Sequence, residues 1–236
     1  MDKINEFKNE IESTFISKIK DVLEGIALEG HLLGSFGRGD FDEFSDLDIW
    51  VTFSDEDFSS FKENRFVLFG EIGEVIHVCE PHQNAPINGI FSTVIYKFKT
   101  GLFVVDYYFC PKSTAFITDE SKSLFGDVIL PTGVLSLNPQ SVKVVDSYRI
   151  DFFICFIFGG IKSIMRKKEN PLQSVFREYD NLKKKYNIDI SPITTQDHNF
   201  STLFEVIENI SKVSNDKQKG ALDEINAFIK EVLAKI

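Results

Sequence analysis

Two aspartates, Asp46 and Asp48, stand at the start of an apolar stretch, SDLDIWV, that reads as a buried strand. Successive side chains of a strand point to opposite faces, so we expect both carboxylates on one face and Leu47, Ile49 and Val51 in a core on the other. Neighbouring carboxylates repel, and both stay ionised most easily with a cation between them. Mg²⁺ or Mn²⁺, hard cations that prefer oxygen ligands, fit this pair best. The alternative is a surface strand end with two solvated acids.

A glycine-rich turn, GSFGRG, precedes the two acids and begins at Gly34. Its three glycines permit backbone conformations that other residues resist, and Gly34 lets a phosphate approach the main chain. Ser35 adds a hydroxyl and an N–H, and Arg38 adds a permanently charged fork suited to phosphate oxygens. Gly-Ser, then Arg-Gly, then Ser-Asp-x-Asp predicts a phosphate-binding turn joined to an acidic strand.

A third acid, Asp106, interrupts the apolar run LFVVDYYFC of residues 102–110. Residues 90–99 alternate between apolar and polar, and the two runs flank Thr100-Gly101, so residues 90–110 predict a hairpin. A lone carboxylate in an apolar strand is costly to bury without a partner. We therefore expect Asp106 to face Asp46 and Asp48 and to share their metals. An edge-strand acid that faces water is the alternative.

The remaining patterns before residue 131 alternate between helix and strand. We predict helices over residues 3–24, 36–41 and 55–69, the last capped by Ser54, and strands over residues 27–33, 47–53 and 74–80. His31 is expected to be packed or hydrogen-bonded and not a ligand. His77 and His82 are candidates for substrate contact at most, because no second ligand stands at helical or hairpin spacing.

Strand patterns end near residues 131–138, where we place a domain boundary. Amphipathic patterns then predict helices over residues 140–168, 172–186, 199–213 and 217–235. Gly159-Gly160 within the first of these suggests close packing against a neighbour. The predicted fold class is α+β: a catalytic domain of mixed sheet and helices over residues 1–135, followed by a helical bundle over residues 136–236.

The net charge of −10 lies in the first half of the chain. Residues 1–138 hold 23 acidic and 11 basic residues, whereas residues 139–236 hold 13 and 15. An acidic half argues against a nucleic-acid surface and suits metal ions or a cationic small substrate. Three widely spaced cysteines and no apolar run long enough to span a bilayer predict a cytoplasmic protein with reduced thiols and no membrane partner. The oligomeric state, a homodimer included, stays open.

The Gly-Ser turn, Arg38-Gly39, the Ser-Asp-x-Asp strand and the later Asp106 resemble the nucleotidyltransferase superfamily related to DNA polymerase beta. A catalytic domain followed by helices is similar to the lincosamide and aminoglycoside nucleotidyltransferases. The resemblance implies that Gly34 and Ser35 bind the β- and γ-phosphates of a nucleoside triphosphate, with Arg38 near them. It also implies that Asp46 and Asp48 ligate two Mg²⁺ ions, and that Asp106 ligates one and can take the proton of the attacking hydroxyl.

In such enzymes the helical domain usually closes the cleft and adds a basic contact. Lys162 and Arg166 are four residues apart on one predicted helix face, which makes them the candidates. The resemblance implies transfer of a nucleotidyl group, AMP from ATP in the simplest case, to a hydroxyl of a small molecule.

Acidic residues expected near the site favour an aminoglycoside acceptor. They neither favour nor disfavour a lincosamide. These acidic residues are Asp40, Asp42, Glu43, Asp55, Glu56 and Asp57. Two alternatives remain. One is a toxin–antitoxin nucleotidyltransferase that modifies a protein or a tRNA, and the other is a non-enzymatic binding module.

Overall fold

The computed structural model describes residues 10–42, 44–81, 84–99, 101–133, 149–194 and 197–234. The chain divides into two compact units, residues 1–75 with 80–143 and residues 76–79 with 144–236. The predicted domain limits at residues 135 and 136 fall outside the described residues and stay a prediction, as does the part of the fourth predicted helix before residue 149.

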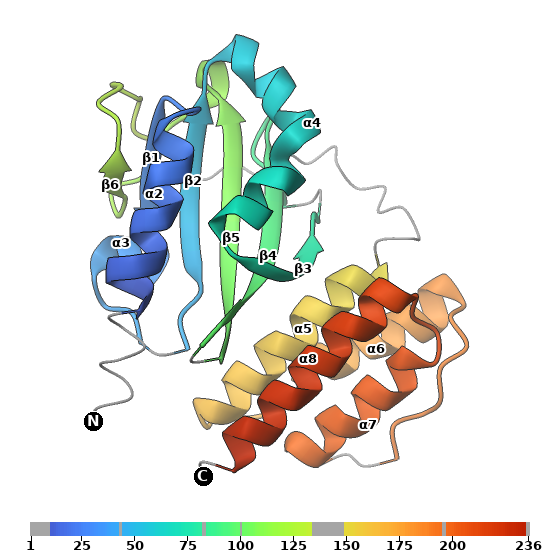
Figure 1. The fold of residues 1–236 in the computed structure, drawn as a ribbon. Coiled ribbons are helices and arrows are strands. Elements are labelled where there is room, and N and C mark those ends of the chain that lie inside the picture. The colour runs from blue at the N-terminus through green and yellow to red at the C-terminus, as the bar shows by residue number, and fades with distance from the viewer. Residues whose placement is uncertain are drawn as a thin grey trace. The chain divides into compact units, whose positions relative to one another are not determined.

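The first unit is built on a six-stranded mixed sheet with strand order β3-β4-β5-β2-β1-β6 (Figure 1), of which residues 76–79 of the edge strand β3 are grouped with the second unit. The strands are β1 (Glu29–Leu33), β2 (Leu47–Phe53), β3 (Glu74–Cys79), β4 (Ile90–Phe98), β5 (Gly101–Pro111) and β6 (Lys122–Phe125). β2 and β5 pair in parallel, whereas β1 with β2, β1 with β6, and β4 with β5 are antiparallel. The predicted mixed sheet and the hairpin of β4 and β5 are confirmed.

Helices cover one face of this sheet (Figure 1). They are the π-helix η1 (Glu10–Phe15), α2 (Ile16–Glu24), the short α3 (Gly34–Arg38) and α4 (Asp55–Ile72). A separate 3₁₀ turn, η3, spans Lys112–Thr114. α2 packs on β1, and α4 packs on β2 and β5. The side chain of Ser54 accepts a hydrogen bond from the N–H of Asp57, which confirms the predicted N-cap of α4.

The alternation of β2 separates the core from the opposite sheet face. Leu47, Ile49, Val51 and Phe53 are almost fully buried, in accord with a core face under the helices. Asp48, Trp50 and Thr52 alternate with them and therefore belong to the other face, where β5 contributes Asp106, Tyr108 and Cys110 at the same register positions. The candidate site lies on this second face.

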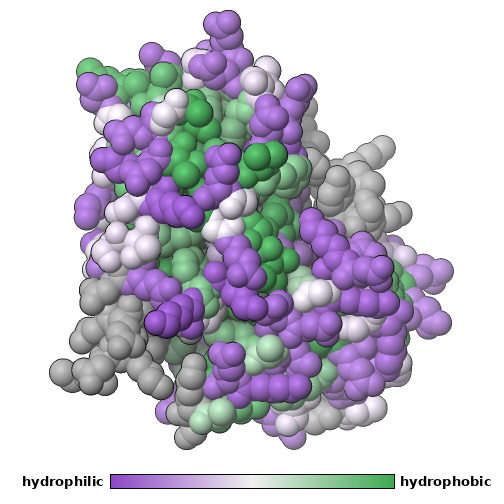
Figure 2. Space-filling model, in the orientation of Figure 1, coloured by the Kyte–Doolittle hydropathy of each residue, from purple (hydrophilic) through white to green (hydrophobic). Residues whose placement is uncertain are grey.

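Four helices make up most of the second unit: α5 (Arg149–Met165), α6 (Gln173–Tyr186), α7 (Phe200–Ser211) and α8 (Asp216–Leu233). A Cβ on Gly160 would lie 2.9 Å from side-chain atoms of both Leu172 and Val175, so this glycine permits the close packing of α5 that the sequence suggested. Gly159 has open space around it. Figure 2 shows hydrophilic side chains over much of the visible surface of these helices.

Two elements differ from the sequence prediction. Strand β6 was missed because only four residues form it, and its single buried side chain, Phe125, leaves almost no apolar pattern. The short helix begins at Gly34, two residues earlier than predicted, because Gly34 adopts a positive φ of 56° that lets β1 turn directly into it. Among the described helices, none combines the length and the apolar character that a membrane span requires.

Candidate active site

Asp48 and Asp106 are direct neighbours on the sheet face opposite the helices. The parallel register of β2 and β5 makes them Cα partners, so their side chains leave adjacent strands in the same direction. Thr93, opposite Asp106 on β4, donates a hydrogen bond of 2.6 Å from Oγ1 to Asp106 Oδ1. The structure thus confirms that Asp106 faces the acidic strand, and it adds Thr93, which no sequence pattern had marked.

Burial raises the pKa of both carboxyls. Desolvation is the main cause in each case, and it raises the pKa of Asp48 to about 6 and that of Asp106 to about 7. The hydrogen bond from Thr93 lowers the pKa of Asp106, while the charge of Asp48 raises it further. The positive charge of Arg38 lowers the pKa of Asp48. Two partly desolvated carboxyls side by side are therefore costly to ionise, and a bound cation would remove that cost.

The Asp48–Asp106 pair fits a divalent metal ion through its donor chemistry, because oxygen ligands are those that Mg²⁺ and Mn²⁺ prefer. Asp46 lies just before β2, so strand alternation does not direct its side chain beside the pair. Within the described ranges, no three His, Cys, Asp or Glu side chains gather closely enough to hold one ion. Ligation by all three aspartates stays a prediction.

Gly34 lies against the carboxylate of Asp48. Its φ is +56°, and a Cβ at this position would come within 2.7 Å of Asp48 Oδ2. Both the backbone conformation and the close approach therefore require glycine here. Ser35 follows in the first turn of α3, and Gly39 ends the helix in a left-handed conformation. The turn predicted to bind phosphate thus adjoins the predicted metal-binding carboxylate.

Arg38 is engaged by two acids. Its Nη1 donates to Glu120 Oε2 at 2.8 Å and its Nε donates to Asp40 Oδ2 at 3.2 Å, and these bonds raise the pKa of the guanidinium. The side chain is 41% exposed. Arg38 can therefore exchange these partners for a phosphate without any rearrangement of the core.

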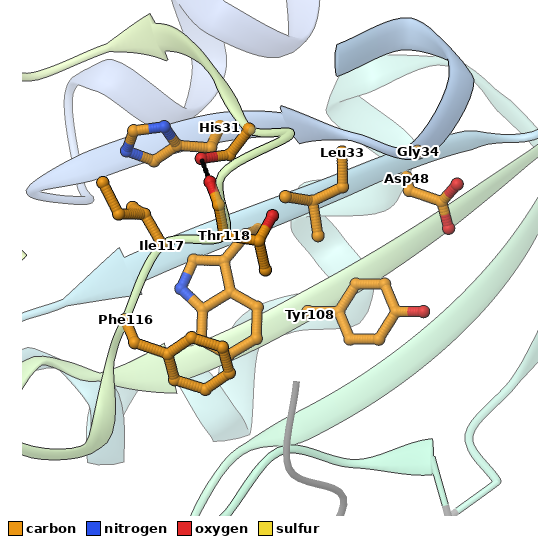
Figure 3. Close-up of a pocket in the computed structure, with 10 residues that line it drawn as sticks. His31, Leu33, Gly34, Asp48, Tyr108, Phe116, Ile117 and Thr118 are labelled. Atoms are coloured by element: carbon orange, nitrogen blue, oxygen red, sulfur yellow. Dashed lines mark hydrogen bonds between the residues drawn. The ribbon is translucent and has the colours of Figure 1, made fainter. Parts of the chain in front are cut away.

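A pocket of about 240 Å³ opens beside Asp48 between the sheet and residues 116–121 (Figure 3). β1 contributes His31 and Leu33, β2 contributes Asp48 and Trp50, and β5 contributes Tyr108. Phe116 covers Trp50 with their ring centroids 4.8 Å apart. The sequence analysis did not mark these aromatic side chains, and only their register beside Asp48 identifies them as pocket residues.

His31 is buried in the pocket wall and is 5% exposed. Its Nε2 is hydrogen-bonded to a carboxylate oxygen of Glu29, which is also buried. His31 is therefore packed and hydrogen-bonded, as the sequence had indicated. His77 is likewise buried, and its Nε2 is 2.9 Å from the main-chain oxygen of Asp151 within the second unit, whereas His82 lies outside the described residues.

The expected acidic surroundings of the site are partly wrong. Asp55, Glu56 and Asp57 begin α4, after the C-terminal end of β2, while Asp48 is the second residue of that strand. Phe53 is five positions after Asp48, which corresponds to roughly 17 Å along a strand. Asp40 lies closer, beside Arg38, and Glu43 is outside the described residues.

Lys162 and Arg166 belong to the second unit. Lys162 lies in the last turn of α5, and Arg166 follows its end with its N–H bonded to the carbonyl of Lys162 at 3.0 Å. This bond continues the helical geometry, so the expected four-residue relationship holds. Their contact with a triphosphate stays a prediction.

Residues 14–98 match the family model of the nucleotidyltransferase domain. This stretch is therefore identified as a nucleotidyltransferase domain, which indicates a transferase enzyme. The family implies a nucleoside triphosphate substrate and usually a divalent metal. A search of curated proteins gave no match. The matched stretch includes Gly34, Asp46 and Asp48 and ends before Asp106, so the position of Asp106 beside Asp48 is independent structural support.

Proposed function

We propose that the protein transfers a nucleotidyl group, AMP from ATP in the simplest case, to a hydroxyl of a small molecule in a Mg²⁺-dependent reaction. The observation that supports this most strongly is the adjacency of Asp48 and Asp106 next to the Gly34 turn. In this proposal Asp46, Asp48 and Asp106 hold two Mg²⁺ ions. The metals would stabilise negative charge on the attacking and leaving oxygens.

The other residues of the site bind the triphosphate and accept the proton of the attacking hydroxyl. Gly34 and Ser35 bind the β- and γ-phosphates, and Arg38 leaves Glu120 to contact the triphosphate. The acceptor hydroxyl attacks the α-phosphorus, a new P–O bond forms, and the bond to the bridging oxygen breaks. Pyrophosphate leaves, and the hydroxyl proton passes to the carboxylate of Asp106. Positioning and charge provide most of the rate acceleration.

Lys162 or Arg166 supplies the basic contact from the helical unit in this proposal. An antibiotic of the lincosamide or aminoglycoside class is the proposed acceptor. Acidic surroundings favoured a polycationic aminoglycoside, but three of the six acids lie away from Asp48. Asp55, Glu56 and Asp57 follow the far end of β2, so the support for an aminoglycoside is weaker.

Purified protein with Mg²⁺ and each nucleoside triphosphate, assayed for pyrophosphate release against an antibiotic panel, tests the proposal. We expect release with ATP and at least one acceptor, and loss of release in Asp48→Asn. Asp119→Asn is the matched control, because Asp119 is an exposed acid outside the pocket. If no combination of nucleotide and acceptor releases pyrophosphate, the proposal of a small-molecule acceptor is wrong.

Labelled ATP added to a cell lysate separates this function from the toxin–antitoxin alternative. A labelled small molecule is expected here. A labelled protein or tRNA, absent with the Asp48→Asn variant, would support macromolecule modification instead.

A further inference from the structure

The pocket beside Asp48 is the right size for one ring. Its volume is about 240 Å³. An apolar cavity of about 150 Å³ binds one benzene molecule, so this pocket accommodates a single ring with its substituents. Trp50, Tyr108 and Phe116 supply flat aromatic surfaces, and the rings of Trp50 and Tyr108 are inclined by only 16°.

The charges of the lining select against phosphate and against polycations. Lys and Arg are absent from the described residues that line the pocket. A phosphate could therefore approach the main chain of Gly34, which lines the pocket, but it would find no cationic side chain elsewhere in the lining. A polycation would find a single carboxylate, that of Asp48, because the other lining side chains are aromatic, aliphatic or uncharged polar groups. An uncharged ring is the group that this lining fits.

Two polar features would orient that ring. His31 Nδ1 is buried and has no hydrogen-bond partner among the described residues, while Nε2 is held by Glu29. Buried polar atoms are normally hydrogen-bonded, so a polar substituent of a ligand would satisfy this nitrogen. Asp48 and Trp50 lie on one face of β2, two residues and about 7 Å apart. A ring packed on Trp50 therefore places a substituent hydroxyl within reach of the carboxylates.

We propose, resting on the proposed transferase function, that this pocket binds an uncharged ring of the acceptor and presents the hydroxyl next to that ring to Asp48 and Asp106. The acceptor is then a molecule that carries an uncharged ring beside its reactive hydroxyl. Polycationic aminoglycosides do not belong to this class. Phe116, Ile117, Thr118 and Ser121 form one wall of the pocket and are specificity-determining residues. Gly34, whose turn is assigned to the triphosphate, also lines this pocket, so the ring and the triphosphate would bind next to each other.

Trp50 provides a direct probe, because it is the only tryptophan in the chain and it lines the pocket. We would titrate the full-length protein with cyclohexanol, with an aminoglycoside, and with ATP and Mg²⁺, and follow tryptophan emission. Cyclohexanol is expected to give a saturable change that saturating ATP and Mg²⁺ do not prevent, and the aminoglycoside is expected to give none. A saturable change with ATP and Mg²⁺ alone would assign the pocket to the nucleobase, and one with the aminoglycoside alone, or with none of the three, would also overturn the inference.

Thr118→Phe fills the pocket, and Asp119→Phe adds the same ring to an exposed neighbour outside it. We expect the dissociation constant of cyclohexanol to rise about tenfold or more in Thr118→Phe and to stay unchanged in Asp119→Phe. Ser121→Leu is the second filling variant if Thr118→Phe does not fold. Equal affinity in filled and control variants would contradict the assignment.

The binding test and the activity test fail separately. Loss of nucleotidyl transfer with intact cyclohexanol binding would refute the proposed function and leave a ring-binding pocket. Transfer to an acceptor that cyclohexanol does not inhibit, and that Thr118→Phe does not affect, would refute the pocket assignment and leave the function standing.

Discussion

The carboxyl of Asp48 on β2 lies beside that of Asp106 on β5, and the charge of Asp48 raises the pKa of Asp106. Neither acid belongs to the hydrophobic core, yet both lose hydration by their position on the sheet. Such a pair destabilises the metal-free protein once both groups ionise, and it becomes favourable when a cation binds. This relationship connects stability, pH and activity in the predictions below.

Asp48→Asn and Asp106→Asn should abolish transfer without unfolding the protein. We expect each variant to lower the rate of pyrophosphate release by roughly a thousandfold, because a ligand for the metal is lost. In the absence of metal and at about pH 8, each should be as stable as the parent or more stable by on the order of 1 kcal/mol, since a desolvated charge is removed. Denaturant unfolding measures this, with Asp119→Asn as the control. A large loss of stability would show a structural role instead.

The metal-free protein should lose stability as the pH rises from about 4 to about 7. The pKa values of Asp48 and Asp106 rise from 3.8 to about 6 and about 7 on folding, so the folded state binds more protons than the unfolded state in this window. The stabilisation is complete below the unfolded pKa and is lost as the pH passes through the folded values. Thermal unfolding in buffers with a chelator measures it.

Mg²⁺ should reverse this dependence. The ion requires ionised carboxylates, so it should raise the melting temperature more at about pH 8 than at about pH 5. A variant with both Asp48→Asn and Asp106→Asn is the control and should show no difference between the two pH values. An equal shift by Mg²⁺ in parent and double variant would place the ion elsewhere.

Thr93→Val should move the acid limb of the activity profile to higher pH. The hydrogen bond from Thr93 lowers the pKa of Asp106, and valine keeps the shape of threonine while removing the donor. Thr52→Val is the matched control, because Thr52 lies on the same sheet face as Asp48 but at the other end of β2. Measured pH–rate profiles that are the same for both variants would exclude a role for Thr93 in setting the charge of Asp106.

Gly34→Ala and Gly39→Ala should separate backbone strain from contact with the carboxylate. Both glycines have positive φ, so each alanine should cost about 1–2 kcal/mol of stability. A Cβ at position 34 also approaches Asp48 within 2.7 Å, whereas position 39 faces open space. Activity should therefore fall by more than about tenfold in Gly34→Ala alone. Equal losses of activity in both variants would attribute the effect to strain.

Local patterns predicted the elements of the first unit well. Leu47–Phe53 alternates clearly and forms β2 with the predicted bounds, and Ser54 caps α4 as its position before three acids suggested. β6 has only four residues and is held by its pairing with β1, so its formation depends on a partner distant in sequence. A local pattern cannot contain that information.

The site itself was predicted in part. Asp48, Asp106 and the Gly34 turn could be found because their residue types conflict with an apolar strand or require special backbone angles. Trp50 and Tyr108 could not, since a buried aromatic residue in a strand reads as core until the register places it beside a carboxylate. The acids of the α4 N-terminus were misplaced for the converse reason: they are near Asp48 in sequence but separated from it by the length of β2.

Glu120→Gln tests whether Arg38 serves the triphosphate. Glu120 accepts a hydrogen bond from Arg38 at 2.8 Å, so its carboxylate competes with any phosphate for the guanidinium. Removal of this competitor should lower the KM for the nucleoside triphosphate by about two- to fivefold with little change in kcat, in line with the modest strength of exposed ion pairs. Arg38→Ala should raise the KM instead, and high salt should reduce both effects. Asp119→Asn is the control, because it removes the same charge one residue away without changing a partner of Arg38. An equal fall in KM in this control would show that net charge alone causes the effect. Arg38 would then no longer belong to the proposed triphosphate contacts.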